Sequence, residues 1–289
     1  MTSLTAVPEA PQHQSVAAEL IFLSPILKEK PFHYRAPPPA GKPVSNVVTE
    51  SQVVNITDLR TLSEEERKGL TIDSAGFQIV EHKSSMGEKD FLDEGIIRDA
   101  YYKECAELLK SITGAVRIFI YDHTVRRVKP GEAESAGNRR PGLGVHGDQT
   151  PKAGAAQVYL HLGEEAERLS KGRVQIINVW RPIKPVVATP LSYGDYRTFD
   201  ANKDLVGCDL FYPDRDGEIY NVKHNAAQKW YYMKDQTPEE TVLLKCYESE
   251  EKPGRALMTP HSAFIDPTVP ADAPARESIE VRALVFYDN

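Results

Sequence analysis

The sequence predicts a mainly β protein with flanking α-helices, in which a helical N-terminal layer packs on a mostly antiparallel β core. In the second half of the chain, segment after segment alternates apolar and polar residues with a period of two, and Pro, Gly or Asp separates the segments. Before them, residues 91–115 repeat apolar residues at steps of three and four, as an amphipathic helix does. The composition, 40% hydrophobic and 27% charged residues, is that of an ordinary folded chain.

The first 50 residues differ from the rest in composition. They are rich in Pro and Ala, with APPPAGKP at 36–43, and no helix pattern runs through them. We expect residues 1–50 to form an extended arm that carries little chemistry, and residues 51–289 to form the folded domain.

Two helices are predicted at the start of this domain. Ser63 is followed three residues later by Glu66, which is a capping-box pattern, and Gly69 ends that helix early. The stronger helix lies within 91–115, where Gly114 occupies the place of a C-terminal cap. These helices would form the N-terminal layer.

Later segments have the alternation and the β-branched residues of strands. They are 115–122, 173–180, 228–233, 241–247, 256–264 and 276–287. Among them, only residues 163–172 predict a helix.

The long stretch between Asp195 and Trp230 shows no such pattern, and we expect an irregular lid over a pocket. Its aromatic residues and His are Tyr196, Phe199, Phe211, Tyr212, Tyr220, His224 and Trp230. Because the cations in this lid are scattered, it favours an apolar, polycyclic or amino-acid-derived substrate over a phosphorylated one.

Charge and cysteine usage limit the class of partner and the compartment. A net charge of −7 argues against nucleic acid or a membrane surface as the main partner, so a small-molecule substrate is expected. Cys105, Cys208 and Cys246 form no CxxC pattern, which indicates neither a disulfide framework nor a thiolate zinc site. The longest apolar run, residues 20–27, is too short to span a bilayer. These features favour a cytoplasmic protein; a homodimer stays open.

The tripeptide His146-Gly147-Asp148 is the first sign of a metal site. On a strand, the side chains of His146 and Asp148 project to the same face, close enough to bind one ion. His261, on a late predicted strand, is the best candidate for a third ligand, since a barrel of strands can bring distant segments together. Two imidazoles and one carboxylate leave coordination positions open, as in the Fe(II) oxygenases that activate O2.

Enzymes of this type usually bind 2-oxoglutarate as a cosubstrate, and its far carboxylate needs a cation. Arg276 offers a planar two-donor fork, Ser278 lies on the same face, and Arg282 lies further along that face. The alternative is that Arg276 and Arg282 form ion pairs with Glu277 and Glu280.

Other histidines compete for a role. The apolar neighbours of His161 indicate that this residue is structural. His224 is a candidate substrate contact, and His123 is expected in a turn.

Several segments together resemble the AsaB-type hydroxylase/desaturase family, over residues 46–289. They are 113–127, 145–150, 177–199, 228–249, 259–267 and 275–287. The resemblance implies a double-stranded β-helix (jelly-roll, cupin-like) core that binds Fe(II) and uses 2-oxoglutarate and O2 in secondary metabolism.

In this resemblance, His146, Asp148 and His261 fall on the positions of the three iron ligands. Asn178 and Arg181, in NVWRP, are implied to face the cofactor or the pocket, with a structural role for Arg181 equally open.

The chain departs from the family pattern at Gly147, where Val is more common, and at Ser192, where Ala is. A Gly between two ligands would loosen the loop or make room for substrate.

The reading that fits best is an Fe(II)/2-oxoglutarate-dependent oxygenase that oxidises a C–H bond of a small metabolite by hydroxylation, desaturation, ring closure or endoperoxide formation. The rivals are a cupin-like hydrolase or isomerase that uses the same ligands on Zn or Mn, and a jelly-roll binding module with a structural ion.

Overall fold

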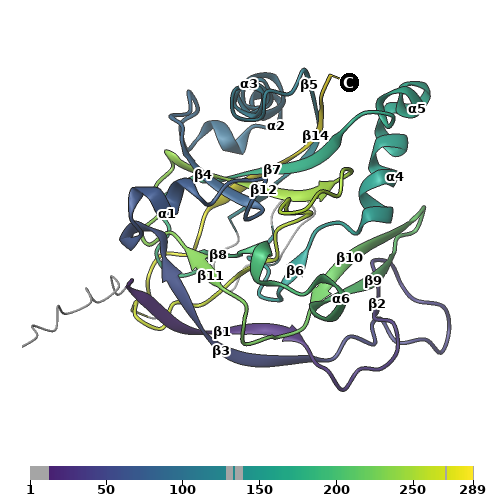
Figure 1. The fold of residues 1–289 in the computed structure, drawn as a ribbon, viewed down its shortest axis with the longest axis horizontal. Helices are drawn as coiled ribbons and strands as arrows, with labels where there is room; N and C mark the ends of the chain where they lie inside the picture. Colours follow the sequence, from purple (N-terminus) through teal and green to yellow (C-terminus); the bar gives the residue numbers. More distant parts are fainter. Residues whose placement is uncertain (1–12, 128–132, 134–138, 271, 289) are drawn as a thin grey trace, which may run out of the picture.

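Two β-sheets lie face to face in the computed structural model of the chain, which describes residues 13–127, 133, 139–270 and 272–288 (Figure 1). The strands are β1 (Ser15–Leu23), β2 (Phe32–Tyr34), β3 (Thr49–Asp58), β4 (Phe77–Glu81), β5 (Arg117–Arg126), β6 (His146–Gly147), β7 (Val174–Pro182), β8 (Leu191–Gly194), β9 (Leu205–Phe211), β10 (Asp216–Val222), β11 (Trp230–Tyr232), β12 (Glu240–Glu248), β13 (His261–Ala263) and β14 (Ser278–Phe286). The helices are α1 (Glu64–Lys68), α2 (Glu94–Ile96), α3 (Tyr102–Thr113), α4 (Pro151–Leu162), α5 (Ala166–Leu169) and α6 (Ala201–Asp204).

The sheets have the strand orders β1-β3-β11-β8-β13-β6-β10-β9-β2 and β4-β12-β7-β14-β5. Neighbouring strands in the described part of the chain are antiparallel, apart from the parallel pairs β3 with β11 and β2 with β9. This curled arrangement of two sheets is a double-stranded β-helix, so the predicted mainly β class and its jelly-roll core are confirmed.

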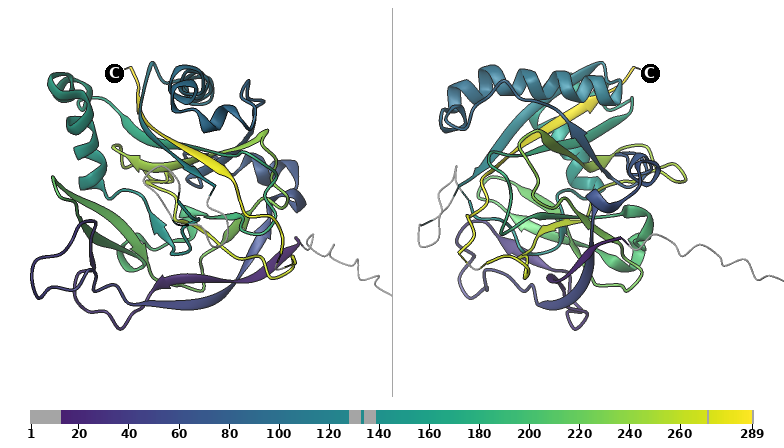
Figure 2. Two further views of the ribbon diagram at one scale, coloured as in Figure 1. Left: turned by 180° about the vertical axis from the view of Figure 1, so that it is seen from behind. Right: turned by 90° about the vertical axis from the view of Figure 1, so that its left-hand side faces the viewer.

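Strand β7 divides two apolar layers. All nine of its residues are buried, and alternate side chains point to opposite faces of the sheet. Trp180 joins the core between the two sheets, whereas Ile177 and Val179 pack toward the helical layer. Figure 2 shows α3 lying along the outer side of the five-stranded sheet. Burial on both faces explains why this strand is nearly all apolar.

The N-terminal helices follow the sequence prediction closely. Helix α1 begins at a complete capping box, in which Ser63 and Glu66 bond each other's backbone N–H groups. Helix α3 ends at Gly114, whose φ of 70° is the left-handed conformation that glycine adopts freely. A π-helical segment, Ile97–Tyr101, joins α2 to α3.

Helix α4 was not predicted, and the helix expected at 163–172 shrinks to the short α5 and a 3-10 turn. The start signal for α4 was present: the Thr150 side chain accepts a hydrogen bond from the Ala153 N–H, and Pro151 follows it as the first helical residue.

The N-terminal stretch is part of the fold and not a separate arm over the residues described. Strand β1 pairs with β3 along nine residues, so the expected boundary near residue 50 falls within a paired strand, β3. Leu20 and Phe22 are fully buried and pack in a cluster with Trp230. The alternation of buried and exposed residues in β1 is a strand signal that the Pro-rich composition around it obscured.

The expected irregular lid is also wrong, because residues 195–230 contain α6, β9 and β10. Three of its aromatic residues pack against other rings: Phe199 and Phe22 meet the Trp230 ring edge-on, and Phe211 packs against Tyr34. Strand β13 is shorter than its predicted segment.

Within the described residues, no helix has the length and apolar character required to cross a membrane.

Candidate metal centre and its cavity

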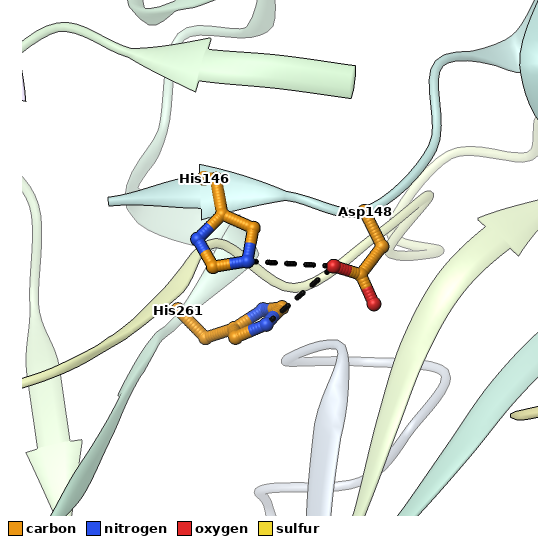
Figure 3. Close-up of side chains that lie close together, drawn as sticks. All are labelled: His146, Asp148 and His261. Carbon is orange, nitrogen blue, oxygen red and sulfur yellow. Dashed lines mark ion pairs between the residues drawn. The ribbon is translucent and has the colours of Figure 1, made fainter. Parts of the chain in front are cut away.

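The two predicted histidine ligands lie opposite each other on neighbouring strands. Strand β6 pairs antiparallel with β13, and His261 is the register partner of His146. Their ring centroids are 4.4 Å apart. Asp148 follows β6, and its Oδ1 lies 3.4 Å from His146 Nε2 and 3.8 Å from His261 Nε2 (Figure 3). One ligand atom from each residue lies within 4.8 Å of the other two.

Backbone carbonyls set the orientation of both rings. His146 Nδ1 lies 2.8 Å from Gly144 O, and His261 Nδ1 lies 2.9 Å from Thr259 O. Because a carbonyl oxygen only accepts, each Nδ1 carries a proton, and in a neutral ring each Nε2 presents a lone pair toward Asp148. Three lone-pair atoms that face one another call for a cation, so this donor set fits a divalent metal ion.

The charge states of Asp148 and His261 agree with this fit, whereas the Asp148 carboxylate raises the pKa of His146 against the effect of burial, so a metal ion would have to displace a proton from that ring. Burial alone would raise the pKa of the Asp148 carboxyl, but the neighbouring imidazoles and Arg282 hold that pKa well below its usual range. Burial, together with the neighbouring His146, lowers the pKa of His261. An ionised carboxylate beside a neutral imidazole is the form in which both groups bind metal.

The second oxygen of Asp148 is held from the opposite sheet. Asn178 Nδ2, on β7, donates to Asp148 Oδ2 at 2.6 Å and to Glu280 Oε1 at 2.8 Å. The Cys246 thiol, on β12, lies 3.4 Å from the same Oδ2 as a weaker donor. These donors occupy Oδ2 and leave Oδ1 facing the two histidines, so Asn178 holds a candidate ligand in place. Its contact with a cofactor stays a prediction.

A cavity of about 680 Å³ opens beside the three residues. Its apolar lining includes Trp180, Leu191, Leu210, Ile219 and Ala263, and its charged lining is mostly arginine. Of the aromatic residues expected in the lid, Tyr212 lines this cavity.

Arg276 lies in the wall of this cavity and is only 4% exposed. Its Nη1 donates to Thr189 O at 3.0 Å, and its guanidinium lies 5.3 Å from the centroid of the Trp180 ring. Burial, together with the nearby Arg126, lowers the pKa of Arg276 to about 9. Such a guanidinium is stabilised by an anion, and within the described residues Arg276 has no carboxylate partner.

Ser278, two residues after Arg276, is the first residue of β14. Its buried Oγ and the buried Nε of Arg276 both lack a hydrogen-bond partner in the described part of the chain. Two unpaired buried polar atoms, two residues apart in the sequence, fit the carboxylate of a bound molecule.

Arg282 lies on the same cavity, but its charge is already compensated. It donates to Asp122 Oδ1 at 3.0 Å and to Glu280 Oε2 at 3.1 Å. This is the ion-paired alternative that the sequence left open for Arg282.

Arg181 lies away from the cavity, contrary to the implied cofactor contact. Its guanidinium donates to Tyr101 Oη at 2.9 Å and to His82 O at 2.8 Å, on the helical side of the sheet. Because alternate residues of β7 face opposite sides, Asn178 and Arg181, three residues apart, cannot share a face.

The competing histidines have other positions. His161, on α4, lines the cavity and stacks on Tyr121 at 4.7 Å. His123 lies on β5 and not in a turn, where it also lines the cavity. His224 packs against Phe22 and lines a separate surface groove, so it is not a contact in this cavity.

Gly147 makes room for a side chain of the protein itself. An added Cβ would stand 1.6 Å from the terminal methyl group of Met258 and 3.5 Å from Tyr220 Cβ. The side chain of Met258 therefore fills the space that a larger residue would occupy, on the face of β6 opposite His146.

A double-stranded β-helix that presents two histidines and one aspartate beside a cavity is the arrangement of the non-haem iron oxygenases. Residues 20–286 match the family model described as an oxidoreductase/YMDC permease-like domain. The chain is 34% identical over 261 residues to the hydroxylase/desaturase efuI of Hormonema carpetanum, covering 83% of this chain and 85% of that one. It is 40% identical over 139 residues to the hydroxylase/desaturase asaB of Aspergillus flavus, covering 43% of this chain and 60% of that relative.

The solved structure of the iron and alpha-ketoglutarate-dependent endoperoxidase NvfI superposes with a TM-score of 0.82 at 30% identity, over 95% of this chain and 99% of that one. The chain belongs to the family whose model residues 20–286 match, and its resemblance to the AsaB-type hydroxylase/desaturases is confirmed. It is an Fe(II)/2-oxoglutarate-dependent dioxygenase of secondary metabolism.

Proposed function

We propose that the chain oxidises a C–H bond of a small secondary metabolite at an iron held by His146, Asp148 and His261. The observation that carries this proposal is the convergence of two imidazole Nε2 atoms on one carboxylate oxygen, each ring fixed by a backbone carbonyl. Relatives named hydroxylase/desaturase and endoperoxidase support an oxidation with more than one possible outcome.

Bound iron and 2-oxoglutarate, together with O2, supply the oxidising chemistry of such a centre. The protein fixes the ligands: Thr259 O and Gly144 O orient the two rings, and Asn178 holds the Asp148 carboxylate.

In this proposal, Arg276 and Ser278 bind the far carboxylate of 2-oxoglutarate. The unpaired Nε and Oγ atoms and the depressed pKa of the guanidinium support this role. The Trp180 ring packs on the guanidinium and limits its rotation, which keeps the donor fork in place. Arg282, already paired with two carboxylates, is the weaker candidate.

The remaining cavity would receive the organic substrate. Apolar side chains of Trp180, Leu191 and Ala263 line it and exclude water near the ligands. The position of the C–H bond relative to the centre would decide among hydroxylation, desaturation, ring closure and endoperoxide formation.

The three cysteines are unpaired and buried, in keeping with a reducing, cytoplasmic location.

Anaerobic titration of the Fe(II)-loaded protein with 2-oxoglutarate tests the metal and the cosubstrate together. We expect the visible charge-transfer band of an iron-chelated keto acid to appear and saturate. The variants His146→Ala, Asp148→Ala and His261→Ala should lose bound iron and the band while keeping the fold by circular dichroism. His224→Ala, in the separate groove, is the matched control and should retain both.

A band that persists in His261→Ala would remove that residue from the ligand set. Turnover that releases succinate distinguishes the oxygenase from a cupin-like hydrolase or isomerase, which would transform substrate without consuming 2-oxoglutarate.

A further inference from the structure

The cavity beside the candidate metal centre is strongly basic, although the chain as a whole has a net charge of −7. Six arginines line it, against three carboxylates. The arginines are Arg35, Arg126, Arg139, Arg215, Arg276 and Arg282, and the carboxylates are Asp122, Asp148 and Glu280. A lining of this composition attracts anions.

The inner arginines already have partners or an assigned role. Arg282 pairs with Asp122 and Glu280, and Arg126 lies 3.9 Å from Glu280. Arg276 is assigned to 2-oxoglutarate in the proposed function. Because a divalent iron and the 2-oxoglutarate dianion together add no net charge, they leave the excess of positive charge in place.

The excess lies at the open side of the cavity, on exposed arginines. Arg35 and Arg139 make no side-chain ion pair within the described residues. Arg215 has one carboxylate neighbour there, the exposed Asp214 next to it in sequence, at 3.2 Å. An exposed pair of adjacent residues contributes little, so this guanidinium stays available to a ligand.

Backbone contacts bring Arg35 and Arg215 to the same end of the sheet. The Arg35 N–H donates to Phe211 O at 2.8 Å and extends the pairing of β2 with β9, which lie side by side in Figure 1. The next residue, Tyr212, donates its N–H to Arg215 O at 2.9 Å, and its ring lies 4.3 Å from the Arg215 guanidinium carbon. Stacking on Tyr212 fixes the orientation of that guanidinium.

The cavity around these arginines is not purely polar, because apolar side chains line it as well. Leu160, Leu210 and Ile219 line the same cavity, together with the ring of Tyr212. A ligand that satisfies both kinds of lining has an apolar body and an acidic group at one end.

We propose that the organic substrate is an apolar carboxylic acid, and that Arg35 and Arg215, assisted by Arg139, bind its carboxylate at the mouth of the cavity. This proposal rests on the proposed function, and it deepens it by naming the substrate class. A guanidinium offers two parallel donors to a carboxylate, so two such groups hold the acid end and direct the apolar body inward. The pairing of β2 with β9 thus brings Arg35, far from Arg215 in the sequence, to the same end of the sheet.

The test compares two fluorescent probes with the same apolar body, 1-pyrenebutyrate and 1-pyrenebutanol. Each is titrated anaerobically into the Fe(II)- and 2-oxoglutarate-loaded protein, and binding is followed by fluorescence anisotropy. The acid should bind at least tenfold more tightly than the alcohol, and this preference should fall as salt is raised. The double variant Arg35→Gln/Arg215→Gln should lose the preference.

The charge-transfer band of 2-oxoglutarate should be unchanged in that variant, which separates this proposal from the proposed function. Arg168→Gln, an exposed arginine that does not line the cavity, is the matched control and should keep the preference. Equal binding of acid and alcohol, no binding of either probe, or a preference that survives in the double variant would each overturn the proposal. A missing charge-transfer band in the unmodified protein would instead count against the proposed function.

Discussion

Replacing Asn178 by Ala tests whether a residue that never touches the metal sets its affinity. The substitution removes a buried donor that lies 2.6 Å from Asp148 Oδ2 and 2.8 Å from Glu280 Oε1. A hydrogen bond to a charged acceptor is worth about 1.5–3 kcal/mol. Since Asn178 Oδ1 has no partner among the described residues, the loss is confined to the amide donor.

Without this donor, the Asp148 carboxylate retains the weaker Cys246 thiol at 3.4 Å and is free to rotate. Loss of a hydrogen bond worth about 1.5–3 kcal/mol corresponds to a loss of roughly 10- to 100-fold in metal affinity. Cys246→Ala should cost less than tenfold, because a thiol is a weak donor.

The assay is competition for Fe(II), and for Co(II) as a spectroscopic substitute, between the metal-free protein and a chromophoric chelator. Asn178→Asp places a further carboxylate against Asp148 and Glu280. Its metal affinity should differ from that of both the unmodified protein and Asn178→Ala, because three like charges then lie close together. Asn225→Ala removes an amide that donates to Asp204 outside the cavity, and it is the matched control. If Asn178→Ala binds Co(II) with the affinity and spectrum of the unmodified protein, Asn178 does not hold the Asp148 carboxylate in its metal-binding position.

Three further predictions concern cosubstrate binding and stability. Arg276→Gln should raise the apparent Michaelis constant for 2-oxoglutarate at least thirtyfold, about 2 kcal/mol, in a succinate-release assay. Arg282→Gln should mainly lower the melting temperature. The opposite result would reverse the roles assigned to the two arginines. Lys245→Met should cost about 3 kcal/mol in urea unfolding, because it leaves the fully buried Glu248 carboxylate with one cation fewer; an unchanged midpoint would show that the remaining ion pair suffices. Gly76→Ala should cost about 3 kcal/mol in the same assay, since its φ is +94° and a Cβ would lie 2.6 Å from a backbone oxygen; equal stability would mean that the turn relaxes freely.

The long strands of the five-stranded sheet were the most predictable part of the fold. Segments such as 173–180 and 276–287 are strongly apolar and β-branched because β7 and β14 are buried on both faces. Strands β9 and β10 escaped prediction because most of their residues are only half-buried, so no clear alternation marks them.

The candidate ligands could be proposed from spacing, but their environment could not. His146 and Asp148 are two residues apart, and that relation is local, whereas the contact of Asn178 with Asp148 depends on how two sheets face each other. Strand parity alone would have separated Asn178 from Arg181, because residues three apart lie on opposite faces. Sequence therefore predicts which residues share a face more reliably than which face lines the cavity.

The pairing of β6 with β13 has a consequence for assembly. The strands are two and three residues long, and one register pair, His146 with His261, joins them. This seam lies in the middle of the nine-stranded sheet, between the strands from β1 to β13 and those from β6 to β2. An ion held by both histidines would cross-link β6 and β13. Metal binding would therefore be thermodynamically coupled to the folding of these two strands. Amide hydrogen exchange around residues 144–148 and 259–263 should then slow on metal binding, far more than exchange in β7.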